Sequence, residues 1–234
     1  MKGSDELKTK VPNNYTTSLE QDEVASEYRA NVVMNVLRSK KVDSNASIVD
    51  VGCGYGILLE KLRDSRFNNY LGVEPIGEVV ESLQSRGIEA ILGDLEKGVD
   101  KIDDKSIHVV TCLEVLEHLY DPESALNKIN RWLQPGGILI LSVPNAYRLR
   151  QRLTMLTGNP TSDVSLVGGH IKFFNWNTIK DMVERAGFRV EAEFGEGGLR
   201  MRKIVPGYMR ILRAFPRLLA KWIFIVAEKT DGNK

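Results

Sequence analysis

The sequence predicts an α/β protein whose core is a doubly wound, mostly parallel sheet with an antiparallel last strand. Short β-branched segments alternate along the chain with segments in which apolar residues recur at helical intervals. Two of the short segments, 107–112 and 138–143, are almost continuously apolar, which is typical of strands that helices cover on both faces. Two more apolar segments, 188–194 and 222–229, lie toward the C-terminus, and we expect them to pair antiparallel around an insertion.

Each expected element has a local reason in the sequence. A leading helix is expected over about 22–38, where apolar side chains are spaced so that one stripe could cover one end of the sheet. The β-branched segments predict strands over residues 47–51, 70–74, 89–92, 107–112 and 138–143. The helical spacing between and after these strands predicts helices over residues 57–62, 79–85, 125–133 and 179–186.

A single domain over residues 1–234 accounts for the length and composition. Of the 234 residues 42% are hydrophobic, enough for one large core, and no repeat or linker divides them. Two insertions interrupt the alternation, one over about 146–174 and a basic one over about 198–221. A long irregular connection in a compact domain is usually functional, so we expect the first insertion to contribute to a site.

Charge and cysteine content limit the partners and the compartment. The formal net charge is +1, so no overall field draws this chain to a polyanion, and a nucleic-acid partner is disfavoured. The first ten residues, MKGSDELKTK, have no apolar core of a signal peptide, which favours a cytoplasmic protein. The two cysteines, Cys53 and Cys112, are too few for a disulfide framework, and we expect them to be buried apolar residues.

Three glycines follow the first predicted strand in the run IVDVGCGYG. Gly52, Gly54 and Gly56 stand just before a helix, where a tight turn favours positive φ and a bound ligand needs close approach of the backbone. About 20 residues later the second strand ends in Glu74, whose carboxylate can accept hydrogen bonds from ribose hydroxyls. Because ligands of open α/β sheets bind at the carboxyl ends of strands, these residues together predict a nucleoside-containing cofactor.

The glycine spacing distinguishes between cofactors. Dinucleotide-binding turns have the pattern G-x-G-x-x-G, whereas this turn is G-x-G-x-G, so an NAD-dependent oxidoreductase is disfavoured. With Asp50 two residues before Gly52, the run resembles the first motif of the class I S-adenosylmethionine-dependent methyltransferases. The resemblance implies a Rossmann-like fold and S-adenosyl-L-methionine as the cofactor. It also implies that the cofactor is bound by Asp50, Gly52, Gly54, Gly56 and Glu74.

Later motifs extend the resemblance over most of the chain, from about residue 29 to residue 229. A Gly-Asp-Leu turn resembles the family's adenine-binding turn, with Asp94 accepting from the amine and the amide of Leu95 contacting the ring. The run VVTCLEVLEHLYDP closely resembles the ubiquinone-biosynthesis O-methyltransferases, in which the residue matching Leu113 packs near the cofactor. By the same resemblance, Arg29 of the leading helix would pair with the methionine carboxylate.

A Glu-x-x-Glu-His motif follows the fourth predicted strand. Glu114, Glu117 and His118 stand at i, i+3 and i+4, so one helical turn would place them on the same side. They could hold a divalent metal ion with His170 as a fourth ligand, as the resemblance to small-RNA 2′-O-methyltransferases implies. Such a spacing recurs often by chance, so we do not assign these residues as metal ligands. His118 and His170 are instead the candidate catalytic bases, because an imidazole with a pKa of about 6.5 can take a proton from a hydroxyl.

Basic residues gather in the two insertions. Arg148, Arg150 and Arg152 in the first insertion suggest an acceptor with a phosphate or carboxylate, or form a solvated charged face. Seven bases and no acid lie between residues 198 and 227, interleaved with apolar residues at helical spacing. Such a segment either contacts an anionic membrane surface peripherally or caps the domain, and Pro216 would kink any single long helix in it.

Together these patterns predict a methyltransferase that transfers a methyl group from S-adenosyl-L-methionine to a hydroxyl oxygen of a small-molecule acceptor. The acceptor can be free or linked to a sugar or a lipid, as in uncharacterised relatives that the insertion resembles. Two alternatives stay open: a metal-assisted RNA 2′-O-methyltransferase, through the Glu-x-x-Glu-His motif, and a noncatalytic cofactor-binding partner protein. No pattern in the sequence assigns an oligomeric state.

Overall fold

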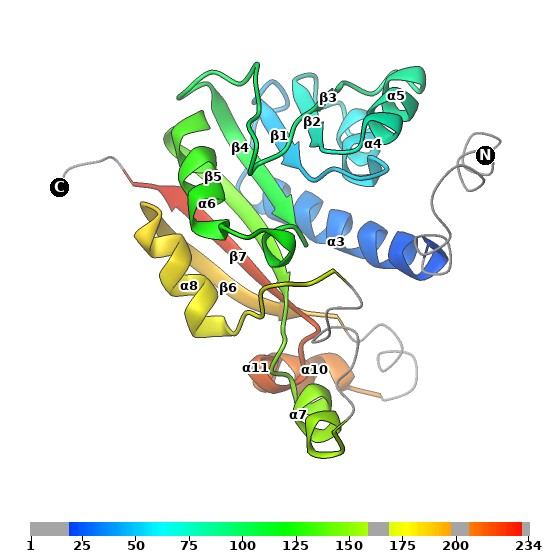
Figure 1. Ribbon diagram of the computed structural model, residues 1–234, viewed down its shortest axis with the longest axis vertical. Helices are drawn as coiled ribbons and strands as arrows, with labels where there is room; N and C mark the ends of the chain where they lie inside the picture. The colour runs from blue at the N-terminus through cyan, green and yellow to red at the C-terminus, as the bar shows by residue number, and fades with distance from the viewer. Residues whose placement is uncertain (1–18, 159–168, 198–205, 231–234) are drawn as a thin grey trace.

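The computed structural model describes residues 19–158, 169–197 and 206–230, and these form a seven-stranded sheet between two layers of helices (Figure 1). The strand order is β3-β2-β1-β4-β5-β7-β6, with β1 to β5 parallel and β7 antiparallel to both of its neighbours. The strands are β1 (Ile48–Val51), β2 (Tyr70–Glu74), β3 (Ala90–Leu92), β4 (Ile107–Leu113), β5 (Leu133–Pro144), β6 (Phe188–Glu196) and β7 (Trp222–Lys229). The predicted fold class is confirmed, including the antiparallel last strand.

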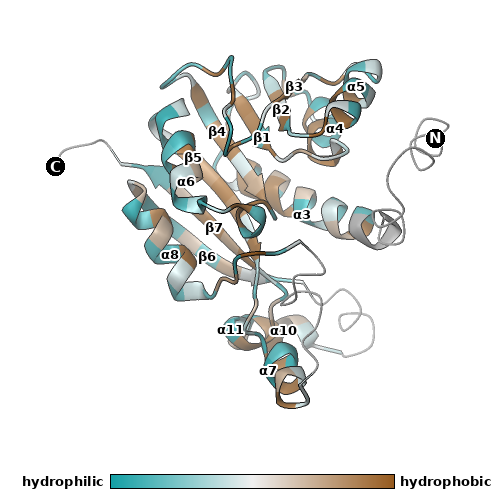
Figure 2. Cartoon of the chain, in the orientation of Figure 1, coloured by the Kyte–Doolittle hydropathy of each residue, from teal (hydrophilic) through white to brown (hydrophobic). Residues whose placement is uncertain are grey.

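Helices cover both faces of the sheet, as the apolar strands require. Buried side chains of α3 (Leu19–Ser39), α4 (Ile57–Asp64) and α5 (Gly77–Ser85) form one cluster with β1, β4 and β5. Those of α6 (Pro122–Trp132) and α8 (Trp176–Arg185) pack on the other face. Figure 2 shows the central strands as the most hydrophobic part of the chain and the outward helix faces as hydrophilic.

The helices α6 and α8 begin about three residues earlier than their apolar spacing predicts, and in both cases a cap explains the difference. The carboxylate of Asp121 accepts from the amide of Ser124 at 2.9 Å, and Pro122 occupies the first turn of α6. In α8, Asn175 and Thr178 form a reciprocal capping box. A cap satisfies amide groups that the helix itself cannot, so it fixes the start of the helix independently of the buried face.

The sheet register brings polar side chains together at the carboxyl ends of the strands. Asp50 of β1 pairs in register with Thr111 of β4, and Leu113 of β4 pairs with Ser142 of β5. Thr111 and Ser142 are fully buried although they lie in otherwise apolar strands. This edge of the sheet is therefore the place where the core contains hydrogen-bonding groups.

The insertions are more ordered than the sequence suggests. The first contains the helix α7 (Leu149–Leu156), where we expected an irregular connection. Its apolar side chains are largely exposed, with Leu153 at 55% and Leu156 at 83%, so no buried stripe marks it as a helix in the sequence. Residues 159–168 of this insertion lie outside the described part of the chain.

The basic segment ends in two short helices, α10 (Tyr208–Ala214) and α11 (Pro216–Leu219), and the expected break occurs at Pro216. Trp222 begins β7, in agreement with the predicted strand 222–229. Leu212 is fully buried, whereas Ile211 and Phe215 are 45% and 60% exposed, so the segment caps the core with one face only. Three of its seven bases, Arg200, Arg202 and Lys203, lie outside the described residues. Within the described residues, no helix is long and apolar enough to cross a membrane.

Candidate active site

The glycine turn between β1 and α4 is in the left-handed region and is open on one side. Gly52, Gly54 and Gly56 have φ values of 66°, 50° and 80°. A Cβ at Gly52 would lie 2.4 Å from a methyl carbon of Val115, so this glycine lets the turn pack against the segment after β4. A Cβ at Gly54 would have no atom within 4 Å. The backbone at Gly54 therefore faces open space at the carboxyl edge of the sheet.

Glu74, the last residue of β2, lies against this turn. Its side chain is buried, and Oε2 accepts from the amide of Gly54 at 3.0 Å while Oε1 accepts from the amide of Ile76 at 3.3 Å. Burial raises the pKa of the Glu74 carboxyl, and the two amide donors partly oppose that change. The turn and the carboxylate form one hydrogen-bonded unit, and the binding of ribose hydroxyls by Glu74 stays a prediction.

Asp50 lies behind the turn and has a different environment. It is 4% exposed, and the Thr111 hydroxyl donates to Oδ1 at 2.6 Å. Burial is the main reason that the pKa of Asp50 rises to about 7, and the nearby Glu74 carboxylate adds to the rise. The neighbouring Cys53 is half-buried rather than buried, whereas Cys112 is fully buried as expected, and burial raises the pKa of both thiols.

We expect Asp50 to make the protein less stable as the pH rises. Its pKa of about 7 in the folded state lies above the ordinary value of 3.8, so the folded protein holds this proton more tightly than the unfolded chain. The stability that the proton confers is complete below pH 3.8 and is lost as the pH rises through 7. Asp50→Asn keeps an oxygen acceptor for Thr111 and should reduce the loss between pH 5 and pH 8 by on the order of 2 kcal/mol. Urea unfolding of both proteins at the two pH values measures this difference, and equal pH dependence in the two would contradict the assignment.

The turn after β3 holds the residues expected to contact adenine. Asp94 is half-buried; Oδ1 accepts from the amide of Glu96 at 2.8 Å and Oδ2 pairs with Nζ of Lys97 at 3.2 Å. These contacts lower the pKa of the Asp94 carboxyl. Leu95 is 4% exposed and packs in the core beneath the turn. The Asp94 carboxylate is thus ionised and held at the surface of the turn.

Two carboxylates follow β4 in different settings, Glu114 half-buried and Glu117 buried. Glu114 has a φ of 57°, and its Oε1 accepts from the Ser142 hydroxyl at 2.8 Å. Both carboxylate oxygens of Glu117 are buried and have no hydrogen-bond partner among the described residues. Burial raises the pKa of both groups, most strongly for Glu117, where the Glu114 carboxylate adds to the effect. Leu113, one residue before Glu114, is half-buried and packs toward α3.

The ring of His118, which follows β4, contacts the ring of His170 in the first insertion. Their ring centroids are 4.8 Å apart at an interplanar angle of 69°. Nδ1 of His118 lies 3.1 Å from the carbonyl oxygen of Gly169, and because a carbonyl can only accept, this nitrogen carries the proton. Burial lowers the pKa of His118, so its ring is neutral near pH 7 and Nε2 is left with a lone pair.

One expectation about the Glu-x-x-Glu-His motif is wrong. The structure groups Glu117, His118 and His170 as possible metal ligands, with one ligand atom of each within 4.8 Å of the others, and Glu114 is not in this group. The short helix η1 (Leu116–His118) begins after Glu114, whose positive φ turns it toward Ser142 instead. The i, i+3, i+4 spacing therefore does not place all three side chains on one side of a helical turn.

Arg29 of α3 lies close enough to Glu114 and Glu117 for its charge to act on both carboxyls. Its guanidinium carbon lies 5.2 Å from the ring centroid of Trp222, and its Nη2 donates to Ser26 at 2.9 Å. Its charge, together with that of Lys221, lowers the pKa of Glu114 and so opposes the effect of burial. The structure thus brings Arg29 near the end of β4, and its pairing with the methionine carboxylate stays a prediction.

The family model described as "Methyltransferase domain" matches residues 23–193 of this chain. The chain belongs to this methyltransferase family. Among curated relatives, it is 27% identical to the mitochondrial ubiquinone biosynthesis O-methyltransferase of Candida albicans over 207 residues, covering 85% of this chain and 60% of that protein. It is 34% identical to the ubiquinone biosynthesis O-methyltransferase of a Pseudomonas aeruginosa strain over 138 residues, covering 51% and 56%. The chain thus spans less than two thirds of the length of these relatives.

Solved methyltransferases share the fold. A structure described as a complex between the Haloferax volcanii Trm112 methyltransferase activator and the putative methyltransferase matches with a TM-score of 0.68, 18% identity and coverage of 94% of this chain and 99% of that one. A Thermotoga maritima protein described as an S-adenosylmethionine-dependent methyltransferase, possible histamine N-methyltransferase, matches with a TM-score of 0.64, 19% identity and coverage of 92% and 96%. At these identities the likeness concerns the fold of the methyltransferase.

Sequence reasoning missed three residues of this site. Thr111 and Ser142 each donate a hydroxyl to a carboxylate, and Trp222 supports Arg29. For the first two a signal existed, because each is a polar residue inside an otherwise apolar strand and lies opposite the end of a neighbouring strand. Trp222 stands at the start of the predicted strand 222–229, and no sequence pattern pairs it with Arg29 of the leading helix.

Proposed function

We propose that this chain transfers a methyl group from S-adenosyl-L-methionine to a hydroxyl oxygen of a small-molecule acceptor. The observation that carries the proposal is the unit of Glu74 and Gly54 beside open space, at the sheet edge to which the neutral His118 also belongs. Oxygen is the preferred target atom because an imidazole base serves a hydroxyl nucleophile, and because both curated relatives described above are named O-methyltransferases.

The residues of the glycine turn fit the cofactor of the family. Each Glu74 oxygen has one amide donor, and a carboxylate oxygen can accept two, so ribose hydroxyls can bond there. Burial makes the carboxyls at the end of β1 and after β4 hold their protons more tightly than ordinary carboxyls, and a cationic sulfonium bound beside them would favour their ionised form. In this proposal Arg29 holds the methionine carboxylate, Asp94 and Leu95 contact adenine, and Leu113 packs against the cofactor.

The bound cofactor supplies an electrophilic methyl group. The chain's own contribution is to hold the acceptor hydroxyl in line with that group, which accounts for most of the rate enhancement in such a reaction. Nε2 of His118 takes up the hydroxyl proton, while the Gly169 carbonyl fixes the ring through Nδ1. His170, in edge contact with His118, is the second candidate for this role.

Calorimetry with S-adenosylhomocysteine tests the first half of the proposal. Assays with isotope-labelled S-adenosylmethionine and panels of phenolic, sugar and lipid-linked hydroxyl compounds test the second, and mass spectrometry of the product locates the methyl group. Binding of NAD without binding of S-adenosylhomocysteine would overturn the methyltransferase assignment. Products methylated only on nitrogen would overturn the choice of oxygen.

A second candidate function is metal-assisted RNA 2′-O-methylation. It is favoured by the Glu117 carboxylate, which is buried without a hydrogen-bond partner among the described residues and lies next to the two imidazoles. A divalent cation there could bind vicinal hydroxyls of an acceptor. Loss of activity on chelation, restored by Mg²⁺ or Mn²⁺, would support this candidate, whereas activity that is unaffected by chelation would leave the histidines as bases.

Peripheral membrane contact is a further part of the proposal and concerns α10. Ile211 and Phe215, the residue after α10, are 45% and 60% exposed, and the neighbouring Arg210 and Arg213 are exposed as well. An apolar and basic surface of this kind can lie on an anionic bilayer, where each base contributes about 1 kcal/mol.

We therefore expect the protein to pellet with anionic vesicles at low salt. The double variant Arg210→Gln/Arg213→Gln should bind them roughly 30-fold less tightly, because two bases are lost. Arg38→Gln/Arg63→Gln, which changes two exposed arginines at the other edge of the sheet, is the matched control and should bind normally. Equal, negligible pelleting with anionic and neutral vesicles would leave α10 as a cap of the core alone.

A further inference from the structure

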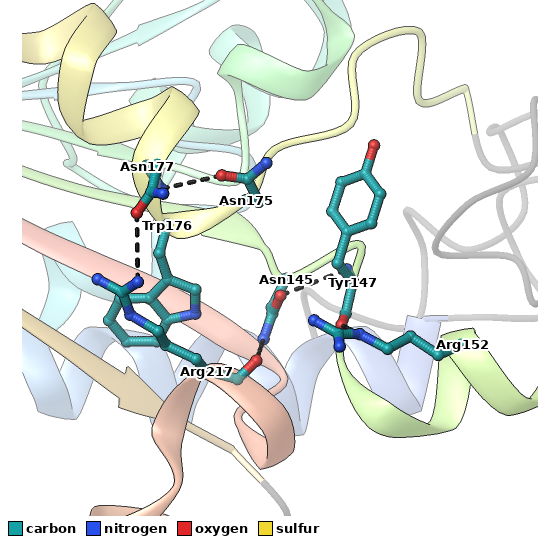
Figure 3. A pocket seen from close by; sticks show the side chains of 7 residues that line it. All are labelled: Asn145, Tyr147, Arg152, Asn175, Trp176, Asn177 and Arg217. Carbon is teal, nitrogen blue, oxygen red and sulfur yellow. Dashed lines mark hydrogen bonds between the residues drawn. The ribbon is translucent and has the colours of Figure 1, made fainter.

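A polar cavity is lined by residues that have no part in the chemistry proposed above. Its volume is about 280 Å³. Its walls come from the residues after β5, from α7, from the start of α8 and from α11 (Figure 3). It is lined by Asn145, Tyr147, Arg152, Asn175, Trp176, Asn177 and Arg217.

The indole of Trp176 gives this cavity an unsatisfied donor. Trp176 is 6% exposed, and its Nε1 is buried with no hydrogen-bond partner among the described residues. An indole N–H can only donate, and burying it unpaired costs free energy. Since Trp176 lines the cavity, a ligand that offers an acceptor atom there would satisfy the indole N–H.

The two arginines of the cavity are held in place by other residues. Nε of Arg152 donates to the carbonyl oxygen of Tyr147 at 2.7 Å. The described residues offer no hydrogen-bond partner to the two terminal nitrogens of this guanidinium, so these can bind a ligand. Nη1 of Arg217 donates to Oδ1 of Asn177 at 3.3 Å. The buried Asn145 links the walls by donating to the carbonyl oxygen of Arg217 at 3.1 Å (Figure 3). It also donates to the carbonyl oxygen of Ala220 at 3.1 Å.

Charge and donor chemistry select the ligand. The lining residues include two cations and no acid. Glu193, which does not line the cavity, lies 3.6 Å from Nη2 of Arg217 and offsets one of the two positive charges. The amides of Asn177 and Thr178 at the start of α8 already donate to Oδ1 of Asn175, so we do not count the N-terminus of this helix among the donors for a ligand. Fixed guanidinium and indole donors match the oxygens of a phosphate or a carboxylate, which accept several hydrogen bonds at once.

The cavity is connected to the candidate bases by short stretches of chain. Trp176 is six residues after His170, so the two are at most about 20 Å apart. On the other side, the amide of Asn145 bonds the carbonyl oxygen of Lys221 at 2.9 Å, and the charge of Lys221 acts on Glu114. An elongated molecule could therefore reach from His118 to this cavity.

We propose that this cavity binds an anionic oxygen group, phosphate or carboxylate, carried by the methyl acceptor at a distance from the hydroxyl that reacts. The role as an acceptor site rests on the proposed function, whereas binding of the anion depends only on Trp176, Arg152 and Arg217. The cavity would then select acceptors by their charged end, independently of the cofactor.

Titration of the protein with inorganic phosphate, followed by the indole N–H signals in ¹⁵N NMR spectra, tests the site directly. The signal that disappears in Trp176→Phe should shift and saturate in the wild type. Arg152→Gln and Arg217→Gln should each raise the dissociation constant at least tenfold. Arg150→Gln is the matched control, since Arg150 is exposed on the same helix as Arg152 but does not line the cavity, and it should bind phosphate normally.

No shift of the Trp176 signal at millimolar phosphate would overturn the proposal, as would equal weakening by Arg150→Gln. Glycerol 3-phosphate and vesicles containing phosphatidic acid then distinguish a soluble phosphate ester from a lipid headgroup. Once an acceptor is known, Arg217→Gln should raise its KM with little change in kcat. Failure of the wild type to bind S-adenosylhomocysteine would overturn the proposed function but leave the phosphate titration as it stands.

Discussion

Gly54→Val should abolish binding of S-adenosylhomocysteine while the protein stays folded. In the wild type, ligand at one hundred times its dissociation constant stabilises the folded state by about 2.7 kcal/mol, or roughly 5–10 °C in a chain of this size. Valine would place a Cβ and two methyl groups in the open space that the backbone at Gly54 faces. We expect the dissociation constant to rise at least 100-fold and the thermal shift to vanish.

The φ of 50° at Gly54 makes the substitution costly for the fold as well, by about 1–2 kcal/mol. Gly87→Val is the control for this cost. Gly87 has a φ of 71° and also no atom within 4 Å of an added Cβ, but it lies between α5 and β3, at the opposite edge of the sheet. Both variants should melt lower than the wild type, and only Gly54→Val should lose the ligand. Equal loss of binding in the two would show that backbone strain, rather than occupied space, is responsible.

The strands were the most predictable part of this fold, because a strand covered on both faces must be continuously apolar. The bounds of β2 and β7 coincide with the predicted ranges 70–74 and 222–229. The helix α7 could not be predicted in the same way, since Leu153 and Leu156 face solvent and leave no buried stripe. Hydrophobic periodicity reports burial, so an exposed helix is invisible to it.

The candidate site was predictable where a motif fixes the backbone and less so where tertiary contacts decide. Gly54 and Glu74 lie together at the carboxyl ends of β1 and β2, as the motif predicts, and the structure adds the hydrogen bond between them. Glu114 does not share a helical turn with Glu117 and His118 as predicted, because its positive φ redirects the side chain. The residue types of the motif do not predict that backbone conformation. Likewise, Trp176 and Arg217 line one cavity only because α8 and α11 come together in three dimensions.

His118→Ala should lower kcat by roughly 10²–10⁴-fold and leave the affinity for S-adenosylhomocysteine nearly unchanged. The Gly169 carbonyl holds the proton on Nδ1, and burial lowers the pKa of the ring, so the wild type presents a neutral Nε2 near pH 7. A base must be unprotonated to act, so the rate should fall as the pH drops through the pKa of His118, below its ordinary value of 6.5. That decline should be absent in the variant.

His108→Ala is the matched control. His108 is the third histidine of the chain and lies near the start of β4, at the amino ends of the parallel strands, where it contacts Ser47. It should keep its kcat even if its stability changes. A large loss of kcat in His170→Ala with a normal His118→Ala would assign the base to His170 instead. A loss of cofactor affinity as large as the loss of rate in His118→Ala would contradict the catalytic role, because a residue that only shapes the pocket affects binding and turnover together, whereas a base affects the proton transfer alone.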